Sequence, residues 1–195
     1  MDVIEPLNIK QKSQLLRIAR DAISAQLLRG SVPAAEVDDA GLNRDSGVFV
    51  TLEEEGRLRG CIGSLEADGP LHRQVAHMAV AAATEDHRFT PLAPSDLMYV
   101  QIEISVLSAM TPIRPSEIEL GVHGLYVAQG RKRGVFLPQV PVQYGWDVPQ
   151  YLSELLTKGG LDAGAYEDPQ TRLFAFTADV FSDADVQDEE SGGAY

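Results

Sequence analysis

Residues 98–106 alternate between apolar and polar side chains, and this alternation limits the possible fold more than any other part of the chain. The apolar positions are Met98, Val100, Ile102, Ile104 and Val106, and the polar positions between them are Tyr99, Gln101, Glu103 and Ser105. A period of two is typical of a strand that buries one face and leaves the other polar. Antiparallel sheets commonly have one such polar face, whereas parallel sheets are buried on both faces. The pattern therefore predicts an antiparallel sheet.

Other segments predict further strands and several helices. Residues 47–65, GVFVTLEEEGRLRGCIGSL, predict a hairpin around a Glu-Glu-Gly turn, residues 124–137 predict a second hairpin around GRKRG, and residues 173–181 predict a last strand. Helical spacing of apolar residues recurs over residues 15–27, 71–82 and 151–156, the last preceded by a capping box from Asp147 to Gln150. Because strands and helices do not alternate steadily, the fold class is α+β, mainly antiparallel sheet with flanking helices.

The length of 195 residues fits a single domain, which we place at residues 1–181. Residues 182–195 contain five acidic residues and no basic one, and they have few apolar side chains to bury. We therefore expect them to form an acidic disordered tail.

Charge and hydropathy exclude several classes of protein. The net charge of −13 argues against nucleic-acid binding, which depends on neutralising phosphates with Lys and Arg. The longest apolar run, residues 78–83, is too short to span a membrane. The first residues, MDVIEPLNIKQK, are acidic where a signal peptide has a basic start and an apolar run. We expect a cytoplasmic protein with no nucleic-acid or membrane partner.

The single cysteine, Cys61, lies in the stretch LRGCIGSLEA between Gly60 and Gly63. Two interpretations stand. Free cysteines are mostly inert buried residues, but Arg59, two positions away on the same strand face, could lower the pKa of the thiol. A base would have to come through the fold, from His87 or His123. The glycines mark either a bulge or close backbone crossing, or space for a ligand.

Metal and cofactor sites are not expected. His72 and His77 are five residues apart, so on a helix they point about 140° away from each other, and a lone cysteine cannot form a C-x-x-C pair. No glycine-rich phosphate motif is present. The polar loop DHRF has two interpretations, a ligand site or an Asp86–Arg88 interaction that pins the loop. The basic turn 131–133 is either solvated or in contact with an anion.

Six ordered motifs, LRGCIGSLEA, DHRFTPL, IEISVLS, HGLYV, RGVFLPQV and YGWD, resemble the AMMECR family, whose prokaryotic members are also called protein A of the AmmeMemoRadiSam system. The resemblance implies an α+β fold with a larger and a smaller lobe and the motifs near a cleft between them. It also implies a pathway shared with a Memo-like protein and a radical SAM protein. It brings no settled reaction.

The resemblance also implies the site residues. The catalytic candidates are Cys61, Glu103 and His123, and the ligand-binding candidates are Arg59, Gly60, Gly63, Asp86, Arg88, Phe89, Arg133, Gln139 and Trp146. Gln143 stands where many relatives have Glu, and Leu156 where a second cysteine is common.

Two functions follow. In the first, an enzyme or enzyme component binds a small polar or anionic substrate: Arg59 and Arg88 hold the anion. In that case Cys61 or Glu103 performs the chemistry and His123 moves protons. In the alternative, a non-catalytic adaptor docks a partner protein through the same motifs.

Overall fold

The computed structural model describes residues 5–32 and 36–186, and the chain divides into two compact units. The first, called here the two-helix unit, comprises residues 5–107 and 179–186. The second, called here the one-helix unit after its single long helix, comprises residues 108–178. Each unit is built on its own antiparallel four-stranded sheet, so the fold is α+β as predicted.

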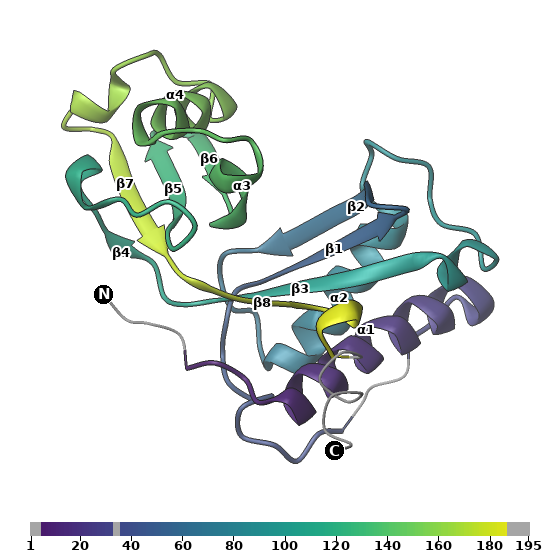
Figure 1. Ribbon diagram of the computed structural model, residues 1–195. Helices are drawn as coiled ribbons and strands as arrows, with labels where there is room; N and C mark the ends of the chain where they lie inside the picture. Colours follow the sequence, from purple (N-terminus) through teal and green to yellow (C-terminus); the bar gives the residue numbers. More distant parts are fainter. Residues whose placement is uncertain (1–4, 33–35, 187–195) are drawn as a thin grey trace, which may run out of the picture. The chain divides into compact units, whose positions relative to one another are not determined.

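The sheet of the two-helix unit has the strand order β2-β1-β3-β8, which makes β2 an edge strand. The strands are β1 (Val48–Glu54), β2 (Arg57–Ser64), β3 (Val100–Leu107) and β8 (Ala178–Ser182). Two helices, α1 (Ile9–Arg29) and α2 (Leu71–Thr84), cover one face of this sheet (Figure 1). The opposite face is therefore free to carry polar side chains.

The core of this unit lies between the sheet and the two helices. Val48, Val50 and Leu52 are fully buried on the predicted face of β1, and they pair with Val106, Ile104 and Ile102 of β3. Helix α1 begins at a capping box from Asn8 to Gln11. It ends at Gly30, whose left-handed backbone (φ 68°) forms the predicted helix stop.

One part of the predicted strand 98–106 is wrong. Met98 lies in a 3₁₀ turn, η1 (Asp96–Met98), and is 77% exposed, so the strand begins only at Val100. The turn is closed by a hydrogen bond from Tyr99 N–H to the Asp96 carbonyl. This local bond takes the backbone out of the sheet before the apolar alternation ends.

The one-helix unit has the strand order β4-β7-β5-β6. Its elements are β4 (Thr111–Pro112), η2 (Pro115–Glu117), β5 (Gly124–Gln129), β6 (Lys132–Phe136), α3 (Gln139–Gln143), α4 (Val148–Lys158), η3 (Ala165–Glu167) and β7 (Arg172–Phe176). The β5–β6 hairpin and the Asp147–Gln150 capping box of α4 are confirmed. Helix α4 packs Tyr151, Leu152, Leu155 and Leu156 into the core of this unit.

The predicted last strand, residues 173–181, is two strands in two different sheets. Strand β7 belongs to the one-helix unit and β8 to the two-helix unit, with Thr177 between them. Thr177 exchanges hydrogen bonds with Ser108, since its N–H donates to Ser108 Oγ and its carbonyl accepts from Ser108 N–H. Apolar character continues across this junction, so sequence periodicity could not reveal the change of sheet.

Residues 182–186 of the predicted acidic tail belong to the folded unit. Ser182 ends β8, and the carboxylate of Asp183 accepts hydrogen bonds from Ile102 N–H and from Arg20. Val186 is buried. An acidic residue that is paired with an arginine and a backbone N–H belongs to the folded unit despite the local composition. Residues 187–195 of the predicted tail lie outside the described residues.

Candidate functional site

Three polar side chains lie next to one another across the sheet of the two-helix unit. Cys61 on β2 pairs with Thr51 on β1, and Thr51 pairs with Glu103 on β3. Directly paired residues share a sheet face, and this face is the one opposite α1 and α2. The Thr51 hydroxyl donates to Cys61 Sγ over 3.4 Å. We call Cys61, Thr51 and Glu103 the polar row.

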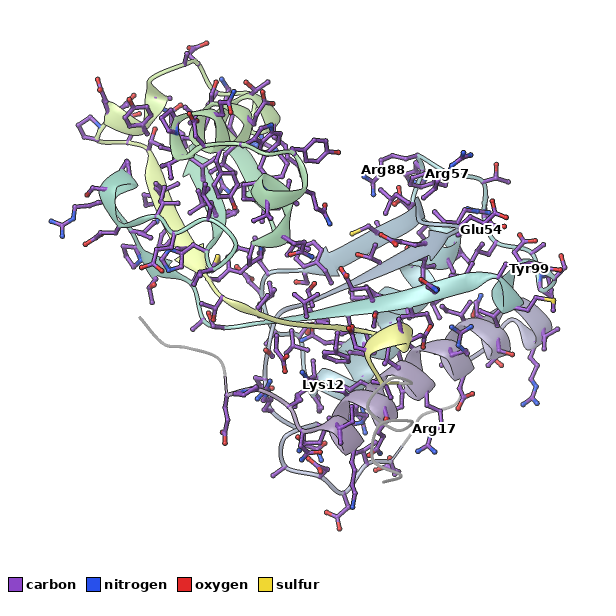
Figure 2. All side chains as sticks on the ribbon, in the orientation of Figure 1. Lys12, Arg17, Glu54, Arg57, Arg88 and Tyr99 are labelled. Carbon is purple, nitrogen blue, oxygen red and sulfur yellow. The ribbon has the colours of Figure 1, made fainter. Side chains whose placement is uncertain are left out.

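The loop after α2 caps the edge of β2 beside the polar row. Cys61 N–H donates to Asp86 Oδ2 (2.9 Å), and Arg88 Nη2 donates to the Cys61 carbonyl (3.1 Å). Figure 2 shows Arg88 beside β2. Because β2 is an edge strand, these outward backbone groups have no neighbouring strand to pair with. Asp86 and Arg88 therefore replace the missing strand, and we call them the edge clamp.

The edge clamp is held together by an ion pair. Arg88 Nε donates to Asp86 Oδ1 (2.9 Å) and Nη2 to Oδ2 (2.6 Å), while the Arg88 N–H also donates to Oδ1. The hydrogen bonds from Arg88 hold the pKa of the buried Asp86 carboxyl far below its usual range. The hydrogen bonds to Asp86 in turn raise the pKa of Arg88. The predicted Asp86–Arg88 interaction that pins the loop is thus present in the structure.

Phe89 contributes to the edge clamp rather than to the polar row. The Arg88 guanidinium lies 5.5 Å from the centre of the Phe89 ring, which is half-buried. This is within the range of a cation–π contact. The ring therefore supports the arginine that holds the strand edge.

Burial raises the pKa of the Cys61 thiol above its ordinary value. The Thr51 hydroxyl and the Arg88 charge oppose this rise, and the carboxylates of Asp86 and Glu103 add to it. A catalytic thiolate requires the reverse shift. Cys61 is half-buried and lies on a polar face, but it is not electrostatically activated.

Arg59 does not act on Cys61 as expected. The β1–β2 register shifts between Leu52 and Glu53, so Arg59 is an extra residue in a β-bulge. Its side chain donates to the Thr90 carbonyl (2.6 Å) and lies about 4 Å from the carboxylates of Glu54 and Asp96. The arginine beside the thiol is Arg88, and a bulge defeats the two-residue spacing on which the expectation for Arg59 rested.

Gly60 and Gly63 have packing roles. A Cβ atom on Gly60 would lie 2.2 Å from the Ala82 carbonyl oxygen, so the glycine allows α2 to approach β2 closely. A Cβ atom on Gly63 would lie 2.3 Å from the Phe49 ring. The bulge and the close crossing suggested by the sequence are both present, one residue apart.

The remaining predicted site residues belong to the one-helix unit. His123 is buried, and its Nδ1 accepts from Glu119 N–H (3.1 Å), which closes a local turn. Arg133 donates to the carbonyls of Gly130 and Lys132. These local bonds give both side chains a role in turns.

Two further predicted residues, Gln139 and Trp146, also lie in the one-helix unit. Gln139 begins the short helix α3 and is half-buried. Trp146 stacks with Tyr144 and meets Phe136 edge-on, with ring centres 5.0 and 5.4 Å apart. Trp146 packs against the core of its unit. The cleft expected between the two lobes stays a prediction.

The two departures from the family pattern have different surroundings. Gln143, at the end of α3, is exposed. Leu156 is buried in the core on α4. The leucine therefore fills an apolar position, and no polar chemistry is available at that point of α4.

Thr51 and Ser105 are two further polar residues of the site face that are not among the predicted site residues. Ser105 is 1% exposed, and its hydroxyl has no hydrogen-bond partner within the described part of the chain. It lies two residues from Glu103 on β3, on the same face. Alternation placed Ser105 on the polar face, but only the strand register shows that Thr51 lies between the thiol and the carboxylate.

Residues 5–32 and 36–186 contain no candidate for either of two further features. No group of three or more His, Cys, Asp or Glu side chains in these ranges is arranged to hold a metal ion. No helix in the same ranges is both long and apolar enough to cross a membrane.

Comparison with known proteins places the chain in a family. The AMMECR1 family model matches residues 16–181. A protein of Methanothermobacter thermautotrophicus is 40% identical over 185 residues, covering 90% of this chain and 96% of its own. Protein MK0488 of Methanopyrus kandleri is 37% identical over 193 residues, covering 94% and 93%.

A solved structure agrees with this assignment. The crystal structure of the uncharacterized protein PH0010 from Pyrococcus horikoshii matches with a TM-score of 0.87 and 33% sequence identity. The match covers 93% of this chain and 95% of that one. With a family model that spans most of the sequence and relatives that align over nearly their whole length, the chain belongs to the AMMECR1 family.

Proposed function

We propose that this protein is an enzyme component that binds a small polar molecule on the sheet face formed by Cys61, Thr51 and Glu103. It acts in the cytoplasm, in a pathway with a Memo-like protein and a radical SAM protein. The pathway partners rest on the resemblance to the AmmeMemoRadiSam system, and the binding role rests on the polar row.

The observation that carries the proposal is the register of three strands. It brings a thiol, a hydroxyl and a carboxylate into adjacent positions on the sheet face opposite α1 and α2. Thr51 is 9% exposed and Cys61 and Glu103 are half-buried. Polar groups held partly out of water on rigid strands are suited to orient a ligand through a few hydrogen bonds.

The charges around the polar row favour a ligand that is neutral or cationic. In addition to burial, two carboxylates, Asp86 and Glu103, raise the pKa of Cys61, and Arg88 opposes them with a positive charge. Arg88 is already paired with Asp86, and Arg59 lies beside two other carboxylates. The two arginines therefore do not form a fork for an anion. We narrow the ligand class to molecules that present hydroxyl, amide or amino groups to Glu103 and Thr51.

In this proposal Cys61 contacts the ligand as a neutral thiol and does not attack it. The raised pKa disfavours a thiolate. Any proton transfer at the row falls to Glu103, the only carboxylate in the row.

The alternative function, a protein-docking adaptor, is favoured by one observation. Leu58, at the start of the same motif on β2, is 42% exposed. A docking surface would need such apolar side chains at its centre, whereas a small-molecule site needs the polar row. Substitutions at Leu58 and at the row therefore separate the two functions.

The test is metabolite profiling of a deletion strain complemented with variants. We expect the same metabolites to accumulate when this gene, the Memo-like gene or the radical SAM gene is deleted. Thr51→Val and Glu103→Gln should fail to restore the normal profile, while Leu58→Ser and Glu66→Gln, an exposed carboxylate away from the row, should restore it. Full restoration by the row variants and failure of Leu58→Ser would instead support the adaptor. Unrelated metabolite profiles in the three deletions would contradict the shared pathway.

A further inference from the structure

A groove runs between α1 and α2 in the two-helix unit, away from the polar row. It is lined by one stripe from each helix: Ile18, Ala22 and Gln26 from α1, and His72, Ala76 and Val80 from α2. Residues four apart lie along one side of a helix, so each stripe is continuous. Ala22 and Ala76, with small side chains, are the middle residues of the two stripes, and the groove has a volume of about 590 Å³.

The size and lining of this groove suit a small organic molecule. Ligand pockets typically have volumes of about 300–1,000 Å³ and mostly apolar walls with a few polar groups. Four of the six stripe residues are apolar, and Gln26 and His72 are the polar ones. The groove shares no residue with the polar row or the edge clamp.

His72 gives the groove a specific polar feature. It is 3% exposed, and its Nδ1 lies 3.1 Å from the Leu42 carbonyl oxygen. A carbonyl only accepts, so Nδ1 carries a proton, and Nε2 is the acceptor in the corresponding tautomer of the neutral ring. Nε2 is buried and has no hydrogen-bond partner among the described residues. A buried acceptor without a partner costs free energy, and a donor supplied by a ligand would recover it.

The rim of the groove carries both signs of charge. Asp21 lines it from α1, and Arg73 and His77 line it from α2. Arg73 is exposed, and its Nη2 lies 3.6 Å from Glu36 Oε1. Because the rim has no dominant sign, the apolar body and the donor to His72 determine what binds, and net charge does not.

We propose that the α1–α2 groove is a second ligand site, which binds a small molecule with an apolar body and one hydroxyl or N–H group that donates to His72 Nε2. This site is independent of the function proposed for the polar row.

The test uses indole and 1-methylindole as probes of the purified full chain, followed by amide NMR shifts. Indole carries an N–H donor on a flat apolar body, and 1-methylindole lacks only the donor. We expect both to shift the amides of Ala22 and Ala76 and to leave the Cys61 amide unchanged. Indole should bind about two- to tenfold more tightly, which is the range for one hydrogen bond.

Variants assign that preference to His72. In His72→Phe the two probes should bind equally, and in Ala76→Phe, which fills the groove, both should bind at least about tenfold more weakly. His87→Phe makes the same change at an exposed histidine outside the groove and should bind as the unmodified chain does. If His72→Phe does not fold, the probe preference of the unmodified chain and the effect of Ala76→Phe still decide. Equal binding of both probes to the unmodified chain, or no shift of the Ala22 and Ala76 amides at millimolar concentration, would overturn the proposal.

Discussion

Replacing Asp86 with alanine is expected to loosen the edge of β2 at Cys61. The carboxylate, 5% exposed, accepts hydrogen bonds from Cys61 N–H and from three nitrogens of Arg88. Its removal leaves the Cys61 N–H without an acceptor. Losing one buried, charge-assisted hydrogen bond costs about 1.5–3 kcal/mol. Arg88 is 58% exposed and is rehydrated by water, so its share is small. We expect a total loss of about 2–4 kcal/mol in the free energy of unfolding.

The assay is urea unfolding together with hydrogen exchange of the Cys61 amide. The exchange measurement is needed because the two units can unfold separately, and it reports on the edge of β2. Asp86→Asn should lose less unfolding free energy than Asp86→Ala, since the amide oxygen can still accept the hydrogen bond from the Cys61 N–H. Glu117→Ala is the matched control, because it breaks the Arg114–Glu117 ion pair of the same length on the exposed surface, and it should change little. A change below about 0.5 kcal/mol with unaltered Cys61 exchange would refute the edge-clamp account.

Acid should remove the contribution of the Asp86 carboxylate to the free energy of unfolding. The pKa of folded Asp86 lies below its unfolded value of about 3.9. A carboxyl with a lowered pKa stabilises the fold above the unfolded value, and this stabilisation is lost as pH falls below about 4. Asp86→Asn cannot lose it, so its stability should fall less steeply between pH 4 and pH 2. Parallel stability curves for the two proteins would contradict this prediction.

Three further changes test the packing of each unit. Gly60→Ala should lower the free energy of unfolding by more than about 3 kcal/mol, because the added Cβ would lie 2.2 Å from the helix backbone, which cannot move away. Gly56→Ala, where there is open space but φ is 72°, should lower it by about 1 kcal/mol. Equal losses for the two variants in urea unfolding would contradict the close approach of α2 to β2. Asp183→Ala should lower the midpoint of thermal unfolding by several degrees, because Arg20 and the Ile102 N–H lose their acceptor. An unchanged midpoint would show that Asp183 does not stabilise the folded unit. Asp147→Ala should cost about 1 kcal/mol by removing the helix cap, and an unchanged denaturant midpoint would show that the capping box is dispensable.

Sequence patterns predicted the elements whose signals are local. The alternation from Val100 to Val106, the β5–β6 hairpin and the Asp147–Gln150 capping box each depend on residues close in the chain. The split of residues 173–181 between two sheets depends on Ser108, about 70 residues away, and no periodicity reports such a contact. The order β2-β1-β3-β8 is likewise set by long-range pairing.

The candidate site shows the same division. The loop-pinning role of Asp86 and Arg88 was one of two interpretations of a short polar motif, because both residues lie in one turn. Arg59 was assigned to the face of Cys61 from a two-residue spacing, which the β-bulge invalidates. Thr51 was missed because only the pairing of three strands places it beside the thiol.

The most direct test of the account is the pH dependence of alkylation of Cys61, the single cysteine, by iodoacetamide. In this account the thiol is a neutral contact on the polar row, with a pKa raised by burial and by the nearby carboxylates. We predict that the rate rises only above the pH at which an ordinary cysteine, with a pKa of about 8.5, would ionise. A rate profile with its midpoint below about pH 7 would show an activated thiolate and contradict the claim.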